Sequence, residues 1–149
     1  MIKTFRGLLG DNESMIINLH TIKGTMGYQI KRFELMPNDP GGVSTEHVVQ
    51  ISKIESADFV TTPTTVVDFS NQDLLAAGFV SNNTNASAYP IGQTIIFDSE
   101  IFNQDIYLVH KTENTTAPVN YYLELELMKL DTNETVMATL KDMRSTSTP

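Results

Sequence analysis

Residues 119–128 carry the most regular pattern of the chain, an alternation of two kinds of side chain. One phase is apolar and the other is largely polar: Tyr121, Leu123, Leu125 and Leu127 against Tyr122, Glu124 and Glu126. Because successive side chains of a strand point to opposite faces, the alternation predicts a strand with one buried and one solvated face. Such a strand belongs to an antiparallel sheet whose apolar face needs a second layer. We therefore expect a mainly β fold, an antiparallel β-sandwich.

Seven other segments have the composition or the alternation of strands. They are Ser14–Ile22, Tyr28–Met36, Glu46–Ile54, Val66–Phe69, Leu74–Val80, Gln93–Phe97 and Asp105–His110. Polar segments, some rich in proline and glycine, separate them and are predicted to be loops, notably residues 37–42, 55–65 and 81–90. About eight strands are expected of a jelly roll or of another Greek-key sandwich, and the sequence leaves the choice between these two open.

The segment Tyr28–Met36 contains a break in its alternation. Ile30 and Phe33 are both apolar, yet they fall in opposite phases of the period-2 repeat. In a regular strand, this break would move the apolar side chains from one face of the sheet to the other. The sequence therefore predicts a β-bulge at Lys31 and Arg32.

Residues 1–10 are predicted to form an N-terminal arm. The apolar residues Ile2, Phe5, Leu8 and Leu9 have a helix-like spacing but are too few for a stable isolated helix. Two interpretations stay open. In the first, Phe5 and Leu8 pack on the chain's own sheet, as ordered termini commonly do. In the second, they clasp a neighbouring subunit.

Residues 132–149 form a C-terminal segment with a different period. Val136, Met137, Leu140 and Met143 recur at helical spacing, after an N-cap signal in residues 131–134. This pattern favours a short helix over about 132–144. The alternative is a hairpin strand beside residues 119–128, with residues 131–134 as the turn.

The 149 residues are expected to form one domain, residues 1–149. A formal net charge of −8 disfavours direct binding to nucleic acid or to anionic membrane surfaces. The chain has no cysteine, which excludes disulfides and thiolate metal sites within it. We also expect neither a membrane span nor a signal peptide, because no long apolar run is present and the first thirty residues lack an apolar core.

Three carboxylates are candidate ligands for a hard cation. Asp98 and Glu100 lie two residues apart and would share a side of an extended segment, and Asp105 follows nearby. Carboxylate oxygens suit calcium, so these acids could form a calcium site. A solvated corner of the fold is the simpler interpretation, and we expect no cofactor.

The three histidines are the other candidate ligands. His20, His47 and His110 fall on three different predicted strands, which could converge in space around a metal ion. They lack the spacing of His-x-His or His-Glu-x-x-His motifs, and the chain has no Gly-x-Ser-x-Gly nucleophile motif. We therefore expect that the protein is not an enzyme.

Four tyrosines keep a second class of function open. Tyr89, Tyr107, Tyr121 and Tyr122 could stack on sugar rings, as in a β-sandwich binding module for a glycan or another host-surface ligand. Aromatic residues on strands more often belong to the core or to cross-strand pairs. The binding module is therefore the alternative interpretation.

Four phrases of the sequence resemble small virion structural proteins of marine bacteriophages. They are residues 5–9 (FRGLL), 97–107 (FDSEIFNQDIY), 120–126 (NYYLELE) and 138–144 (ATLKDMR). The resemblance spans most of the chain and includes no active-site motif. It implies a location in the virion and a non-enzymatic structural role, as a capsid decoration or minor capsid component. The implied partners are further copies of the chain, in a homo-oligomer, and other virion proteins such as a major capsid protein.

Overall fold

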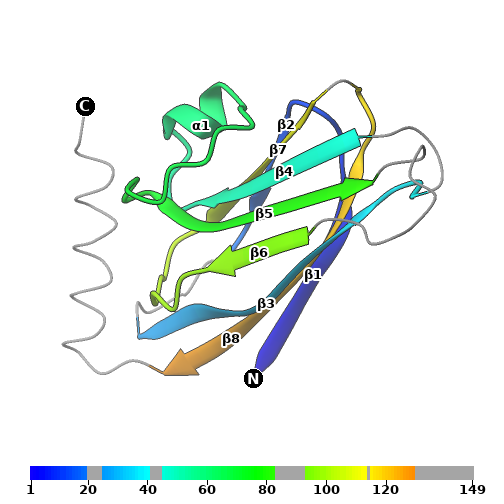
Figure 1. Ribbon diagram of the computed structural model, residues 1–149. Coiled ribbons are helices and arrows are strands. Elements are labelled where there is room, and N and C mark those ends of the chain that lie inside the picture. The colour runs from blue at the N-terminus through cyan, green and yellow to red at the C-terminus, as the bar shows by residue number, and fades with distance from the viewer. Residues whose placement is uncertain (20–24, 41–44, 83–92, 114, 130–149) are drawn as a thin grey trace.

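The computed structural model describes residues 1–19, 25–40, 45–82, 93–113 and 115–129. These residues form two antiparallel sheets that pack face to face, with one short helix outside them (Figure 1). The expected mainly β fold, an antiparallel β-sandwich, is therefore confirmed. The strands divide unequally, three in one sheet and five in the other.

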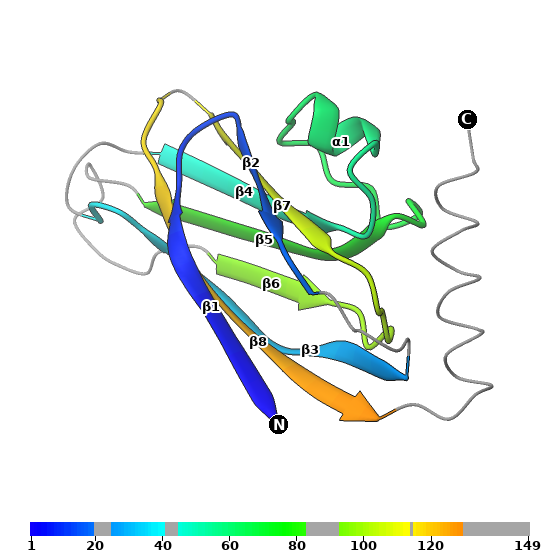
Figure 2. The ribbon, with the colours of Figure 1, turned by 180° about the vertical axis from the view of Figure 1, so that it is seen from behind.

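The three-stranded sheet is built around the strand that the alternation predicted. Strand β8 (Val119–Lys129) lies between β1 (Ile2–Leu9) and β3 (Met26–Pro37), and both neighbours run antiparallel to it (Figure 2). Leu123 and Leu125 are fully buried, whereas Tyr122 and Glu124 are only partly covered. The predicted buried face of β8 is thus the inner face of the sandwich.

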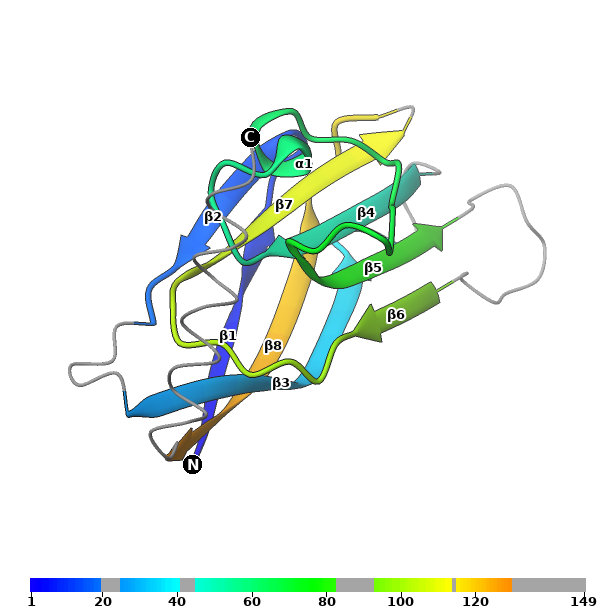
Figure 3. The ribbon, with the colours of Figure 1, turned by 90° about the vertical axis from the view of Figure 1, so that its left-hand side faces the viewer.

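The five-stranded sheet has the order β2-β7-β4-β5-β6. Its strands are β2 (Glu13–Ile17), β7 (Ile106–Glu113), β4 (Thr45–Ser52), β5 (Leu74–Asn82) and β6 (Gln93–Phe97). All neighbouring pairs are antiparallel. Figure 3 shows these strands side by side, with β6 as the last strand of the sheet.

The predicted β-bulge in β3 is confirmed. The register against β8 shifts between Ile30 and Arg32, so that Ile30 lies opposite Leu125 and Phe33 opposite Leu123. The extra residue brings both Ile30 and Phe33 into the core, where each is 2% exposed. One bulge therefore lets a strand of mixed phase present a continuous apolar face.

Residues 1–10 do not form an arm. Residues 2–9 are the strand β1, which pairs along its whole length with β8. Phe5 packs against the core of its own chain, while Leu8 is 48% exposed. The interpretation that both residues pack on the chain's own sheet is correct for Phe5 and wrong for Leu8. Main-chain pairing with β8 places the segment, and its helix-like spacing was misleading.

The predicted strand Val66–Phe69 is absent, and the predicted loop 55–65 contains a short helix, α1 (Asp58–Thr61). The connection from β4 to β5 covers part of the outer face of the five-stranded sheet, where Phe59 and Val60 pack against Val109 (Figure 1). Val66 and Phe69 lie beyond this covered area and are 72% and 64% exposed. Val66 and Phe69 are therefore exposed surface residues and do not belong to a strand.

The two sheets approach closely at Gly78 of β5. A Cβ atom there would lie 2.7 Å from Cδ1 of Leu35 and 3.0 Å from both Ile95 and Phe33. The inner face of β5 therefore has no room for a side chain at this position.

The C-terminal segment 132–149, with its predicted helix, lies outside the described residues. In the part of the chain that the structure describes, no helix is both long and apolar enough to cross a lipid bilayer.

Candidate functional site

Two of the three candidate metal ligands among the histidines meet inside the sandwich. His47 of β4 and His110 of β7 are diagonal neighbours, because Val49 lies opposite His110 and His47 opposite Thr112. Nδ1 of His47 lies 3.0 Å from Nε2 of His110, and the rings stack with their centroids 5.1 Å apart. Both side chains are almost fully buried, at 1% and 0% exposed.

The hydrogen-bond partners determine which nitrogen atoms carry protons. Nδ1 of His110 lies 2.9 Å from the carbonyl oxygen of Gly10, which can only accept a hydrogen bond. His110 therefore donates from Nδ1, and its Nε2 accepts a hydrogen bond from Nδ1 of His47. This chain of donors links β4, β7 and the turn between β1 and β2.

Asp11 completes the polar end of the sandwich. One oxygen of its carboxylate accepts hydrogen bonds from the main-chain N–H and the hydroxyl of Thr112, both at 2.8 Å. The other oxygen lies 3.8 Å from the ammonium group of Lys111. Burial alone would raise the pKa of Asp11, but the two hydrogen bonds from Thr112 and the nearby positive charge hold it below its usual value.

Both histidines are neutral at physiological pH. Burial, together with the neighbouring ring of His110, lowers the pKa of His47 to about 4. Burial also lowers the pKa of His110, although its hydrogen bond to Gly10 and the charge of Asp11 oppose the shift. A neutral pair with no access to solvent is suited to holding strands together and not to exchanging protons with a substrate.

The structure does not assemble the three-histidine site. His20 lies outside the described residues. Within the described ranges, no three His, Asp or Glu side chains form a group that could hold a metal ion.

The three acids proposed as calcium ligands each bind a different group. Glu100 pairs with the ammonium group of Lys53 at 3.2 Å, and the two side chains are only 13% and 6% exposed. Asp98 accepts a hydrogen bond from the main-chain N–H of Glu100. Asp105 accepts one from the main-chain N–H of Leu19 at 2.7 Å. The carboxylates that could have converged on a cation are instead used to fix the loop before β7.

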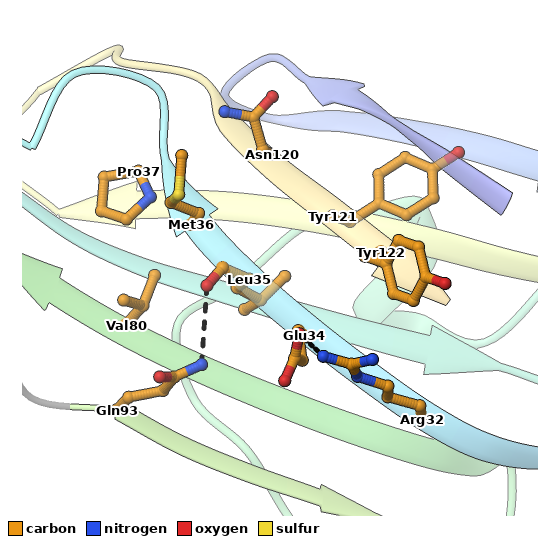
Figure 4. Close-up of a pocket in the computed structure, with 10 residues that line it drawn as sticks. All are labelled: Arg32, Glu34, Leu35, Met36, Pro37, Val80, Gln93, Asn120, Tyr121 and Tyr122. Carbon is orange, nitrogen blue, oxygen red and sulfur yellow. Dashed lines mark hydrogen bonds and ion pairs between the residues drawn. The ribbon is translucent and has the colours of Figure 1, made fainter. Parts of the chain in front are cut away.

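A groove of about 730 Å³ lies beside β3, where the two sheets border each other (Figure 4). It is lined by Arg32, Glu34, Leu35, Met36, Pro37, Val80, Gln93, Asn120, Tyr121 and Tyr122. The guanidinium group of Arg32 lies 5.3 Å from the centre of the Tyr122 ring and forms an ion pair with Glu34 at 2.9 Å. The hydroxyl of Tyr122 donates to Glu124 at 2.7 Å. The groove thus combines an aromatic ring with charged groups.

The other tyrosines considered for sugar stacking are placed differently. Tyr121 is 6% exposed and donates its hydroxyl to the sulfur of Met15. Tyr107 packs against the apolar cluster beneath α1, which includes Phe59. Tyr89 lies outside the described residues. Tyr122 is therefore the described tyrosine from this set that combines partial exposure with a place in the groove.

An apolar surface lies at the last strand of the five-stranded sheet. We call it the β6 border: the strand β6 with the neighbouring side chain of Phe69. Ile96, Phe97 and Phe69 are 47%, 38% and 64% exposed. The same three residues line a hollow of about 260 Å³ together with Leu74, Leu75, Ala76 and Asp98.

The sequence pattern includes the residues of the β6 border but indicates no role for them. It predicts a strand at Gln93–Phe97, with the bounds that β6 has, and another strand at Val66–Phe69. The signal for a surface was present in the uncharged apolar run Ile95–Phe97 next to polar segments.

No protein-family model, no curated protein and no solved structure matches the chain.

Proposed function

We propose that this protein is a non-enzymatic structural protein of a virus particle, a capsid decoration or minor capsid component that acts through protein–protein contacts. The observation that carries the proposal is the β6 border. It joins exposed apolar side chains to a strand at the edge of a sheet. Such surfaces are typical of sites where another protein binds, because apolar area is exposed to solvent and main-chain groups at the edge lack partners in the sheet.

Two further features support this proposal. The most enclosed titratable cluster of the described residues, His47 with His110, is sealed from solvent and hydrogen-bonded to the main chain. One of the phrases that resemble small phage virion proteins, residues 97–107, begins at the end of β6. A rigid sandwich that presents an apolar border fits a role in which surface contacts are the function.

The proposal is tested by the composition of purified particles. Particles from the source culture are banded on a density gradient, and the copy number of this chain relative to the other proteins is measured by quantitative mass spectrometry. A high and constant copy ratio across the particle band is expected. Absence of the chain from the band, with the chain present in the soluble fraction, would contradict the structural role.

The groove beside β3 supports a second candidate function, a binding module for a glycan or another host-surface ligand. Its support is the exposed pairing of Tyr122 with Arg32, since aromatic faces and charged groups together suit sugar rings. Titration with a panel of oligosaccharides, followed by NMR of the main-chain amides of the groove residues, such as Leu35 and Asn120, tests it. Saturable shifts that are lost in Tyr122→Ala would favour this function. Unchanged spectra would remove it.

A further inference from the structure

The four edge strands of the described sandwich differ in how they are protected. Strand β1 carries Lys3 and Arg6, and β3 carries Lys31 and Arg32 together with its bulge and the terminal Pro37. Charges, bulges and prolines are the usual devices that prevent an edge strand from pairing with another chain. Strands β1 and β3 are therefore protected edges.

The two edges of the five-stranded sheet are less protected, and they are not alike. Strand β2 begins with Glu13, whose carboxylate binds the N–H of Gly10. Strand β6, with the sequence Gln-Thr-Ile-Ile-Phe, has no charged residue, no proline and no shift of register against β5. Among the described edges, β6 is the one that lacks all three protective devices.

The main-chain groups of β6 alternate in direction. The N–H of Asp98 donates to the carbonyl of Leu75 at 2.8 Å, which makes these two residues a hydrogen-bonded pair. Counting back along the antiparallel ladder, Ile96 and Thr94 also direct their main-chain groups towards β5. Ile95, Phe97 and Gln93 therefore direct theirs away from β5, on the side where the side chain of Gln93 donates to the carbonyl of Leu35 in β3.

We propose that two copies of this protein pair through β6, strand against antiparallel strand, and join their five-stranded sheets into one continuous sheet. The inference rests on the contact-making role of the β6 border in the proposed function and names the partner as a second copy. A two-fold axis at Ile95 pairs this residue with Ile95 of the second copy, and Gln93 with Phe97. These are the residues whose main-chain groups point outwards.

The side chains of β6 suit this register. Thr94 and Ile96 share the outer face, so each Ile96 lies opposite Thr94 of the second copy, an apolar contact between β-branched side chains. No charged side chain faces another across the pair. The symmetric contact uses the same patch twice and closes at two copies, so it does not propagate into fibres.

Charge favours a second copy at this place over other parts of the surface. The net charge of −8 makes two copies repel on average. Residues 93–97 carry no charge, the largely buried Glu100 after β6 is paired with Lys53 of the same chain, and the exposed carboxylate of Asp98 lies beyond the paired residues. Two acidic copies can therefore meet at β6 without opposing unpaired charges along the strand.

The test uses the chain of 149 residues in two charge-altered forms, Ile96→Lys and Ile96→Glu. Ile96 is 47% exposed, so neither change removes a core side chain. The molar mass of each form is measured by size exclusion with light scattering over a range of concentrations. We expect the unaltered chain to reach twice its molar mass of 16.6 kDa at high concentration. The dissociation constant of the dimer should be at least roughly tenfold higher in each altered chain.

An equimolar mixture of the two altered chains is the decisive sample. In the proposed register the two Ile96 positions lie diagonally across the pair, so Lys and Glu attract each other and the mixture should recover the dimer. The matched control is Ile16→Lys, an isoleucine 45% exposed on β2, the opposite edge of the same sheet, which should leave the dimer intact. A mixture that stays monomeric, or loss of the dimer in Ile16→Lys, would overturn the pairing.

The result also separates this inference from the proposed function. A chain that is monomeric at all concentrations but present in particles at constant copy number would overturn the β6 pairing and leave the structural role standing. A dimer that the two charge variants control, in a chain absent from particles, would keep the pairing and overturn the structural role. If the isolated monomer protects the amides of Ile95 and Phe97 from hydrogen exchange, its own chain covers the edge and the pairing is wrong.

Discussion

Nδ1 of His47 donates a hydrogen bond to Nε2 of His110 inside the sandwich, across 3.0 Å and with both rings almost fully buried. His110 in turn donates to the carbonyl of Gly10. The pair therefore joins two strands of the five-stranded sheet to the turn that leads from the other sheet. Because the rings are buried as neutral groups, this connection depends on pH.

The first prediction concerns stability in mild acid. The folded-state pKa of His47, about 4, lies below its unfolded value of 6.5, so the unfolded chain binds the proton more tightly. Stability is then complete above about pH 6.5 and falls as the pH decreases towards 4. Urea unfolding should give a free energy about 2 kcal/mol lower at about pH 4.5 than at about pH 7.5.

The variant His47→Asn is the control for this prediction. Its amide nitrogen takes the position of Nδ1 and can still donate to Nε2 of His110, but it does not titrate, so the loss of stability between these two pH values should shrink. The lowered pKa of Asp11 acts below its usual value of 3.8 and does not contribute in this window. An identical loss in the variant and the unaltered chain would exclude His47 as the titrating group.

The second prediction concerns the close approach of the sheets at Gly78. In Gly78→Ala the new methyl group would meet Leu35, Ile95 and Phe33 within the packed core, which should destabilise the fold by about 1–3 kcal/mol. Gly10→Ala is the comparison. Its methyl group would lie 2.6 Å from the carboxylate of Glu13, the end of an exposed side chain that can move away. Thermal unfolding should show a clear decrease for Gly78→Ala and a smaller one for Gly10→Ala.

The third prediction concerns the ion pair of Lys53 with Glu100. Lys53→Met leaves a largely buried carboxylate without its partner and should cost about 3 kcal/mol. The double variant Lys53→Met with Glu100→Gln removes both charges and should recover most of this loss. Lys31→Met removes an exposed pair with Glu126 and should change stability by less than about 1 kcal/mol. Equal effects of the two single changes, measured by urea unfolding, would contradict this account.

The fourth prediction concerns calcium. Glu100, Asp98 and Asp105 are held by an ammonium group and two main-chain N–H groups. We expect that neither millimolar calcium nor a chelator changes the melting temperature. A rise with calcium that disappears in Asp98→Asn would instead support the calcium site, and with it the binding-module function.

Regular alternation made most of the fold predictable. Strand β8 and the bulge at Lys31 and Arg32 follow from period 2 alone, because burying one face leaves few acceptable registers. Strand β1 did not follow, since Phe5 and Leu9 are its only apolar side chains that lie towards the core. Its position comes from main-chain pairing with β8, a partner more than a hundred residues away.

The histidine pair and the β6 border lay beyond sequence analysis for a related reason. The meeting of His47 with His110 depends on the register of β4 against β7, which no local pattern specifies. The exposure of Phe69 and Ile96 depends on how far the connection around α1 covers the sheet. Composition marked these residues as apolar, but only the packing shows that they remain uncovered.

Hydrogen exchange in particles tests the central claim, that the β6 border is a protein contact surface, most directly. Exchange of the segment 93–97 is compared between purified particles and the dilute isolated chain by mass spectrometry, with the exposed β2 edge at Ile16 as an internal reference. We predict slower exchange at Ile95 and Phe97 in the particle, with Ile16 unchanged. Equally fast exchange of residues 93–97 in both samples would contradict the account.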